Sequence, residues 1–190
     1  MSDLEKDAGD ALPGGTGDTG DTGFTVRILS PLDADRYQRL RLLAIDDSPT
    51  AIWPTRDEQS RRSIPDIVAR IRPMPDQVVF GAFVDDALVG VTGLSRETLR
   101  QIGHKASIWG VFVEPAHRGQ GIATSLLHAA TEYASTEWDC VLLLLRVNSV
   151  NLPAQRLYTA HGFTSFGTEP RAMQVDGRFY DEEHMVKHLR

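Results

Sequence analysis

The sequence has a single cysteine and no run of about 18 apolar residues. Cys140 therefore has no partner for an internal disulfide, and inside the run CVLLLL we interpret it as a small buried hydrophobic residue rather than a nucleophile. Without a long apolar run, and with the acidic start MSDLEKDAGD, the sequence predicts neither a membrane span nor a secretory signal. We expect a cytoplasmic protein without a membrane partner.

Basic residues are also few, with 20 Lys and Arg against 26 Asp and Glu and a formal net charge of −6. Residues 1–23 hold six acidic residues and one lysine, so they account for −5 of this charge and leave −1 for residues 24–190. Binding to nucleic acid depends on clustered Lys and Arg that neutralise phosphates. The nearly neutral remainder of the chain therefore predicts no nucleic-acid partner.

Apolar residues are scarce in residues 11–23, which read ALPGGTGDTGDTG. Such a segment has little to bury and cannot offset the entropy of ordering, so we predict a disordered acidic tail at residues 1–23. The remaining residues, 24–190, are enough for one well-buried core, and we expect a single domain there.

Apolar periodicity from residue 24 onward predicts strands alternating with helices. The predicted strands are 24–29, 77–84, 87–94, 106–113, 140–147, one beginning at 163, and a final hairpin around Asp176-Gly177. The predicted helices begin near 33, 55, 122 and 151, and Pro65 should kink or split the second. Strand 140–147 is apolar throughout, which predicts burial on both faces in a central parallel position. Together these elements predict a three-layer α/β/α fold with a mixed, mostly antiparallel sheet of about seven strands.

A glycine-containing loop, HRGQGIA at residues 117–123, joins a predicted strand to a predicted helix. The first amide N–H groups of a helix lack partners and carry the positive end of its dipole, so they can bind an anion. Gly119 and Gly121 leave these amides uncovered, and Arg118 adds a guanidinium suited to phosphate oxygens. Glycines at such a turn can equally be structural. Thr124 stands where a GxGxxG motif needs glycine, and no GxxxxGK[ST] is present, so dinucleotide redox chemistry and nucleotide hydrolysis are not favoured.

Two motifs resemble those of the GNAT superfamily, the acetyl-CoA-dependent N-acetyltransferases. Arg118–Ala123 resemble the family's R/Q-x-x-G-x-G/A signature, and the segment from Asn151 to Phe163 resembles its N-x-x-A-x-x-L-Y-x-x-x-G-F pattern. The resemblance covers residues 24–190 and is strong for 106–166. It implies a GNAT-like fold and transfer of an acetyl group from acetyl-CoA, by direct attack, to a primary amine of a small molecule or peptide. It implies no metal, and a homodimer is compatible with it.

The resemblance also assigns roles to individual residues. The backbone of Phe112 and Val113 would pair with the pantetheine amides, and the Val113 N–H would bind the thioester oxygen. Asn151 would face the coenzyme arm, although a helix N-cap explains this residue equally well. Tyr158 would be the general acid, because its ordinary pKa of about 10 is close to that of a thiol leaving group; a core aromatic is the alternative. The coenzyme pyrophosphate would be held by Arg118, Gly119, Gln120, Gly121, Ile122 and Ala123.

The general base is left open by the sequence. Many family members carry an acidic residue on the strand before the loop, but ASIWGVFV has none before Glu114. Glu97 and His104, acting through water, or direct attack by an already neutral amine remain as alternatives. The missing acid also leaves room for a second function, a non-catalytic acyl-CoA-binding sensor or regulatory module, against which Tyr158 argues.

Three further residues have side chains suited to a functional site. Trp53 lies where the family usually builds its acceptor pocket, although a core or surface aromatic fits equally well. His184 and His188 would share one side of a strand, but two histidines without a third ligand do not predict a metal site. The acceptor itself is not predicted by the fold; we expect residues 46–75 and the closing hairpin to select it.

Overall fold

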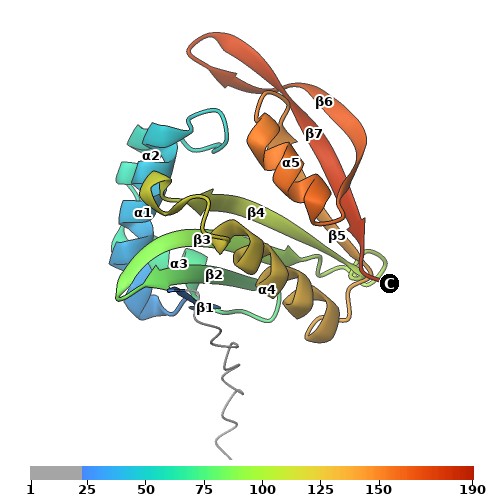
Figure 1. The fold of residues 1–190 in the computed structure, drawn as a ribbon, viewed down its shortest axis with the longest axis horizontal. Helices are drawn as coiled ribbons and strands as arrows, with labels where there is room; N and C mark the ends of the chain where they lie inside the picture. Colours follow the sequence, from blue (N-terminus) through green and yellow to red (C-terminus); the bar gives the residue numbers. More distant parts are fainter. Residues whose placement is uncertain (1–22) are drawn as a thin grey trace, which may run out of the picture.

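The computed structural model describes residues 23–190, and the predicted acidic tail, residues 1–23, lies outside them apart from Gly23. These residues form one seven-stranded sheet in the order β1-β2-β3-β4-β5-β7-β6 (Figure 1). All neighbouring strands are antiparallel except β4 and β5, which are parallel. The predicted mixed, mostly antiparallel sheet is confirmed. The strands are β1 (Thr25–Ile28), β2 (Gln77–Val84), β3 (Ala87–Arg96), β4 (Lys105–Val113), β5 (Leu142–Asn148), β6 (Thr164–Val175) and β7 (Arg178–His188).

Helices cover both faces of the sheet, as the predicted three-layer fold requires (Figure 1). Helix α4 packs on one face, where Leu126 and Leu127 join a buried cluster with Leu94 and Leu143. Helices α1 and α3 cover the other face in a second cluster. No helix within residues 23–190 is long and apolar enough to cross a membrane. The helices are α1 (Ala34–Asp47), α2 (Arg56–Ser60), α3 (Ile64–Ile71), α4 (Ile122–Thr136) and α5 (Leu152–Ala160).

The segment predicted as one helix from residue 55 is two helices, which confirms the predicted split. The Thr55 hydroxyl accepts from the N–H of Glu58 and caps α2, and the Ser63 hydroxyl accepts from the N–H of Asp66 and caps α3. Pro65 therefore lies in the first turn of α3, where its missing N–H costs no hydrogen bond.

Strand β5 differs from its prediction of burial on both faces. Leu143, Leu145 and Val147 are buried, but Leu144 is half-buried and Arg146 is exposed. The reason is that Leu144 and Arg146 line a cavity on their face of the sheet, which opens where the pairing of β5 with β4 ends after residue 144. An apolar run in the sequence cannot distinguish a face buried in the core from one that borders a cavity.

Strand β4 separates from β5 near a β-bulge at Gly110. Gly110 has a φ of +64°, and the pairing register between β3 and β4 shifts at this point, opposite Thr92. Such a bulge adds one residue to a strand and bends it. In Figure 1 the half of the sheet formed by β5, β7 and β6 turns away from the half formed by β1–β4. The sheet is therefore open along the second half of β4.

Candidate active site

The glycine loop lies between the end of β4 and the start of α4. Gly119 and Gly121 have φ angles of +77° and +83°, and Gly121 is the N-cap of α4. A Cβ atom added to either glycine would meet no atom within 4 Å. The glycines are therefore required by backbone conformation and not by packing, and the loop is exposed to solvent. This geometry leaves the N-terminal amides of a 15-residue helix open to an anion.

The side chain of Arg118 is not free beside these amides, in contrast to the role expected from the sequence. Its Nε donates to the carbonyl of Val113 at 3.0 Å, and its Nη2 binds the carboxylate of Asp47 at the end of α1. Hydrogen bonds from Ser48 and then from Arg118 lower the pKa of Asp47. The guanidinium therefore ties the loop to β4 and α1, and an anion site here depends on backbone amides.

The backbone of β4 presents one N–H group at its end to the open side of the sheet. The N–H of Glu114 donates to the carbonyl of Val89 at 2.8 Å, and Val113 and Phe112 lie opposite Gly90 and Val91. Because hydrogen bonding alternates along an antiparallel pair, the backbone groups of Phe112 face β3 and those of Val113 face away from it. The carbonyl of Val113 is taken by Arg118, so of the two residues expected to pair with pantetheine only Val113 keeps an open group, its N–H.

Tyr158 on α5 belongs to the buried cluster that also contains Leu126 and Leu127 of α4. It is 7% exposed, and its ring meets Phe163 edge-on at 6.0 Å. Its hydroxyl has no hydrogen-bond partner within residues 23–190. Burial raises the pKa of Tyr158 well above its ordinary value. The match to a thiol assumed from the sequence therefore does not hold in the free protein, where the phenol stays protonated through the neutral and alkaline range.

Asn151 caps α5, as one of its two interpretations predicts. Its Oδ1 accepts from the N–H of Ala154 at 3.2 Å. We expect Asn151→Ala to cost about 1 kcal/mol and to lower the melting temperature by roughly 2–4 °C in differential scanning calorimetry. Asn151→Asp keeps the acceptor oxygen and should melt within about 1 °C of the wild type. Equal destabilisation by both substitutions would contradict the capping role.

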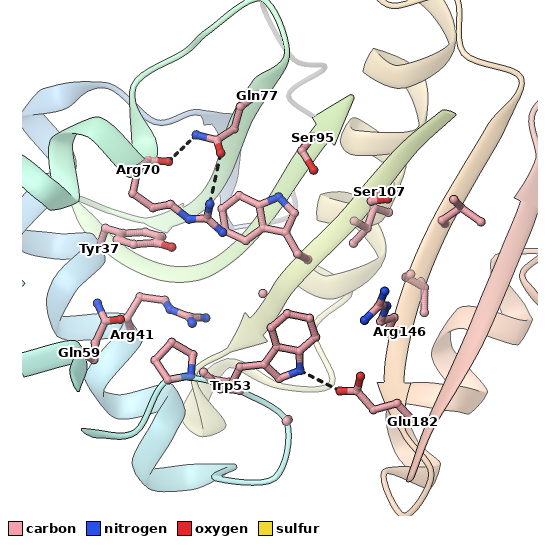
Figure 2. Close-up of a pocket in the computed structure, with 18 of the residues that line it drawn as sticks. Tyr37, Arg41, Trp53, Gln59, Arg70, Gln77, Ser95, Ser107, Arg146 and Glu182 are labelled. Atoms are coloured by element: carbon pink, nitrogen blue, oxygen red, sulfur yellow. Dashed lines mark hydrogen bonds between the residues drawn. The ribbon is translucent and has the colours of Figure 1, made fainter. Parts of the chain in front are cut away.

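A cavity of about 720 Å³ lies on the side of the sheet that carries α1 and α3 (Figure 2). One wall is formed by α1, α3 and the segment around Trp53, the opposite wall by β5 and β7, and Ser107 and Gly110 of β4 lie between them. The cavity thus brings together parts of residues 46–75 and of the closing hairpin. Glu97 lines it, whereas His104 does not.

Trp53 connects the two walls of the cavity. Its Nε1 donates to Oε1 of Glu182 on β7 at 3.0 Å, and the guanidinium of Arg146 lies 5.7 Å from its ring centre. Trp53 is 64% exposed, so it is not a core residue. Glu182, in contrast, is only 5% exposed, and its place in the cavity was not predicted from the sequence. Strand alternation places Glu182 and His184 on one face, but the surrounding YDEEHM does not show that this face is a cavity wall.

His184 is the second cavity residue whose place the sequence did not reveal. Its Nε2 lies 3.0 Å from Oε2 of Glu169, an oxygen that also lies 3.6 Å from Nη1 of Arg146. A carboxylate only accepts hydrogen bonds, so Nε2 carries the proton and Nδ1 is the acceptor of the neutral ring. Within residues 23–190 no three His, Cys, Asp or Glu side chains are grouped to hold a metal ion.

Comparison with known families gives a match to the Acetyltransferase (GNAT) family over residues 40–163, a range that includes β4, the glycine loop and Tyr158. The chain belongs to this family. Among relatives, a streptothricin acetyltransferase from Escherichia coli is 35% identical over 94 residues, which are 50% of this chain and 51% of that protein. A spermidine N(1)-acetyltransferase from Vibrio cholerae is 28% identical over 102 residues, covering 54% and 59% of the two chains. This GNAT chain thus spans about half the length of the curated relatives it matches.

The GNAT fold is also seen in solved structures. The structure of yncA from Salmonella typhimurium, solved with its cofactor acetyl-CoA, superposes with a TM-score of 0.75 at 21% identity, covering 88% of this chain and 94% of that chain. At this identity the likeness establishes the shared fold alone. It agrees with the seven-stranded sheet and with the helices on both of its faces.

Proposed function

We propose that this protein is an enzyme that transfers the acetyl group of acetyl-CoA to a primary amine of a small molecule or peptide. One observation carries the proposal: the exposed glycine loop at the start of α4 follows the strand that separates from β5, and the 720 Å³ cavity borders the same strand. An anion held at the loop and an acceptor held in the cavity can therefore meet at β4. Membership in an acetyltransferase family supports this assignment.

In this proposal each residue of the site has a separate role in acetyl transfer. The amides of Gly119 to Ala123 hold the coenzyme pyrophosphate, and the N–H of Val113 binds the thioester oxygen as negative charge develops on it. The amine nitrogen forms a bond to the acetyl carbon while the bond from this carbon to sulfur breaks. Tyr158 gives its proton to the departing thiolate. The buried phenol loses its proton only when the thiolate lies beside it, which limits the step to the occupied site.

We assign the role of general base to His184. An imidazole exchanges a proton near neutral pH, and the hydrogen bond to Glu169 at 3.0 Å fixes the ring so that Nδ1 can accept the proton of the amine. Two glutamates also line the cavity, but Glu182 is already bound to Trp53, and Glu97 is exposed to solvent just beyond the end of β3. A base on β7 would also explain why β4 carries no acidic residue before Glu114.

His184→Gln tests this assignment, because glutamine can keep a hydrogen bond to Glu169 but cannot take up a proton. We expect kcat at neutral pH to fall by about 10²-fold and to recover partly as the pH rises, since more of the amine is then neutral. His188→Gln, at the exposed end of the same strand and outside the cavity, is the matched control. Equal pH–rate profiles for the wild type and His184→Gln would exclude His184 as the base.

The proposed function as a whole is tested by a thiol-release assay with acetyl-CoA over a library of polyamines, amino acids, aminoglycosides and peptides. We expect thiol release to match the amount of acetylated amine measured by mass spectrometry. Binding of acetyl-CoA without acetylation of any amine would instead support the sensor or regulatory module. No binding of acetyl-CoA at all would contradict both functions.

A further inference from the structure

The cavity contains a buried positive charge that has no partner among the residues that the structure describes. Arg41 projects from α1 into the cavity, as Figure 2 shows, and it is only 8% exposed. Its Nη1 is buried and makes no hydrogen bond within residues 23–190. Nη1 lies 3.3 Å from the position that a Cβ atom of Gly110 would occupy, so the guanidinium reaches the point where β4 bends away from β5.

The surroundings of Arg41 add positive charge instead of compensating it. Arg70 of α3 lies over the ring of Trp109 at 3.7 Å and donates to Oε1 of Gln77 at 3.3 Å, which is a neutral partner. Desolvation is the largest cause that lowers the pKa of Arg70, and the charges of Arg41 and Arg62 lower it further. The interaction with Tyr37 acts in the opposite direction. In the part of the chain that the structure describes, neither Arg41 nor Arg70 forms a salt bridge with a carboxylate.

An arrangement of this kind is unfavourable in the free protein. A guanidinium remains charged at all ordinary pH values, and a buried charge without a counter-ion costs several kcal/mol. Arg41 carries this cost, and the solvent-exposed Arg70 adds a second positive charge to the same cavity, so the two side chains together favour an anion from outside. A carboxylate fits this requirement because it accepts two parallel hydrogen bonds from a guanidinium.

We propose that Arg41 and Arg70 bind a carboxylate of the acceptor, so that the acceptor is an amine that also carries a carboxylate, as a free amino acid does. The proposal rests on the proposed function and names its substrate class. The opposite wall supports it, because Glu182 and His184 line it and can accept hydrogen bonds from an amino group, and His184 is in turn bonded to Glu169. The cavity thus presents positive charge on the wall of α1 and α3, whereas on the opposite wall Glu182 lies together with Arg146 of β5.

The proposal distinguishes this chain from acceptors that carry positive charge alone. A polyamine would bring its second cation toward Arg41 or Arg70, where like charges repel. An amino acid would place its carboxylate there and its amine across the cavity. The two relatives described above are named for spermidine and streptothricin, so their names do not predict this preference.

Isothermal titration calorimetry on the protein saturated with coenzyme A tests the site without requiring turnover. Each probe pair consists of an amino acid and its decarboxylated amine: leucine with isoamylamine, methionine with 3-(methylthio)propylamine, and phenylalanine with phenethylamine. We expect at least one amino acid to bind on the order of 10- to 100-fold more tightly than its amine, the effect of a hydrogen-bonded charge pair. Arg41→Met should remove this difference. Binding of every amine as tightly as its amino acid would overturn the proposal.

The melting temperature of Arg41→Met separates a ligand-binding role from a structural one. Because methionine removes an unpaired buried charge, we expect the free variant to melt roughly 2–4 °C above the wild type. An arginine kept for stability would give a lower melting temperature instead. Arg39→Met, on the exposed face of the same helix, is the matched control and should change neither measurement.

The affinity for acetyl-CoA completes the test. We expect Arg41→Met to bind acetyl-CoA as tightly as the wild type does. If the variant loses acetyl-CoA affinity as much as it loses amino acid affinity, Arg41 binds the coenzyme and the proposal is overturned. Thiol release with amines but not with amino acids would also overturn it while leaving the proposed function intact. Binding of amino acids without acetylation of any amine would support the carboxylate site and contradict the proposed function.

Discussion

Replacing Gly121 with glutamate should weaken acetyl-CoA binding by about 100-fold or more. The substitution places a carboxylate at the N-cap of α4, where a negative charge already at the helix terminus competes with the incoming diphosphate. A charge-assisted hydrogen bond contributes about 1.5–3 kcal/mol, so loss of two of them is enough for this effect. Isothermal titration with acetyl-CoA measures it directly.

The backbone at Gly121 requires a control for strain. Its φ of +83° would cost any L-residue roughly 1–2 kcal/mol, whatever the side chain. Gly177, in the turn between β6 and β7, has a φ of +79° and equally open space around a Cβ atom. Gly177→Glu therefore introduces the same strain and charge away from the loop and should keep the wild-type affinity. If both variants bind acetyl-CoA as the wild type does, the loop is not the coenzyme site.

Tyr158→Phe should lower kcat by about 10²-fold and leave the affinity for acetyl-CoA within about 3-fold. Phenylalanine fills the same buried space and keeps the edge-on contact with Phe163, but it cannot give a proton to the thiolate. Steady-state kinetics with one amine, together with titration of acetyl-CoA, separate the two effects. The hydroxyl has no partner within residues 23–190, so its removal should not reduce stability.

The raised pKa of Tyr158 adds a prediction about alkaline pH. The protonated phenol is the active form, so kcat should fall only when the pH exceeds the pKa of the folded protein. Because burial raises this pKa, the wild type should show no loss of rate near pH 10 that can be assigned to a tyrosine. A fall near pH 10 that disappears in Tyr158→Phe would show that the phenol titrates normally.

The salt bridge of Arg118 with Asp47 changes the role expected of the loop motif. The sequence suggested a guanidinium that binds phosphate, whereas the structure uses it to connect the loop, the end of β4 and the end of α1. In the free protein the guanidinium of Arg118 positions the loop, and the proposed binding of the coenzyme pyrophosphate is left to the backbone amides of residues 119–123.

Local features of the candidate site could be predicted from the sequence. A strand, a loop with two glycines and an apolar helix in this order define the exposed N-terminus of α4, because each depends on neighbouring residues only. The same holds for the caps at Thr55, Ser63 and Asn151. The spacing of Tyr37, Arg41 and Ala44 even places Arg41 on the buried face of α1, since these residues follow one another at helical intervals.

The cavity and its charges could not be predicted in this way. Trp53 and Glu182 are 129 residues apart, and their hydrogen bond exists only because the segment between α1 and α2 and strand β7 form facing walls of one cavity. Whether Arg41 has a counter-ion depends on every element that packs around it. The prediction that β5 is buried on both faces was wrong for the same reason. The separation of β4 from β5 after residue 144 opens the cavity that one face of β5 borders.

The sequence by itself determined the order of the elements, the glycine loop, and the family resemblance carried by residues 118–123 and 151–163. These features follow from periodicity and backbone conformation, which neighbouring residues decide. The tertiary structure alone decided the open edge of β4, the charges that line the cavity, and the lack of a partner for Arg41 within residues 23–190. They arise where segments distant in the chain meet or fail to meet, and the free energy of a charge depends on those distant neighbours.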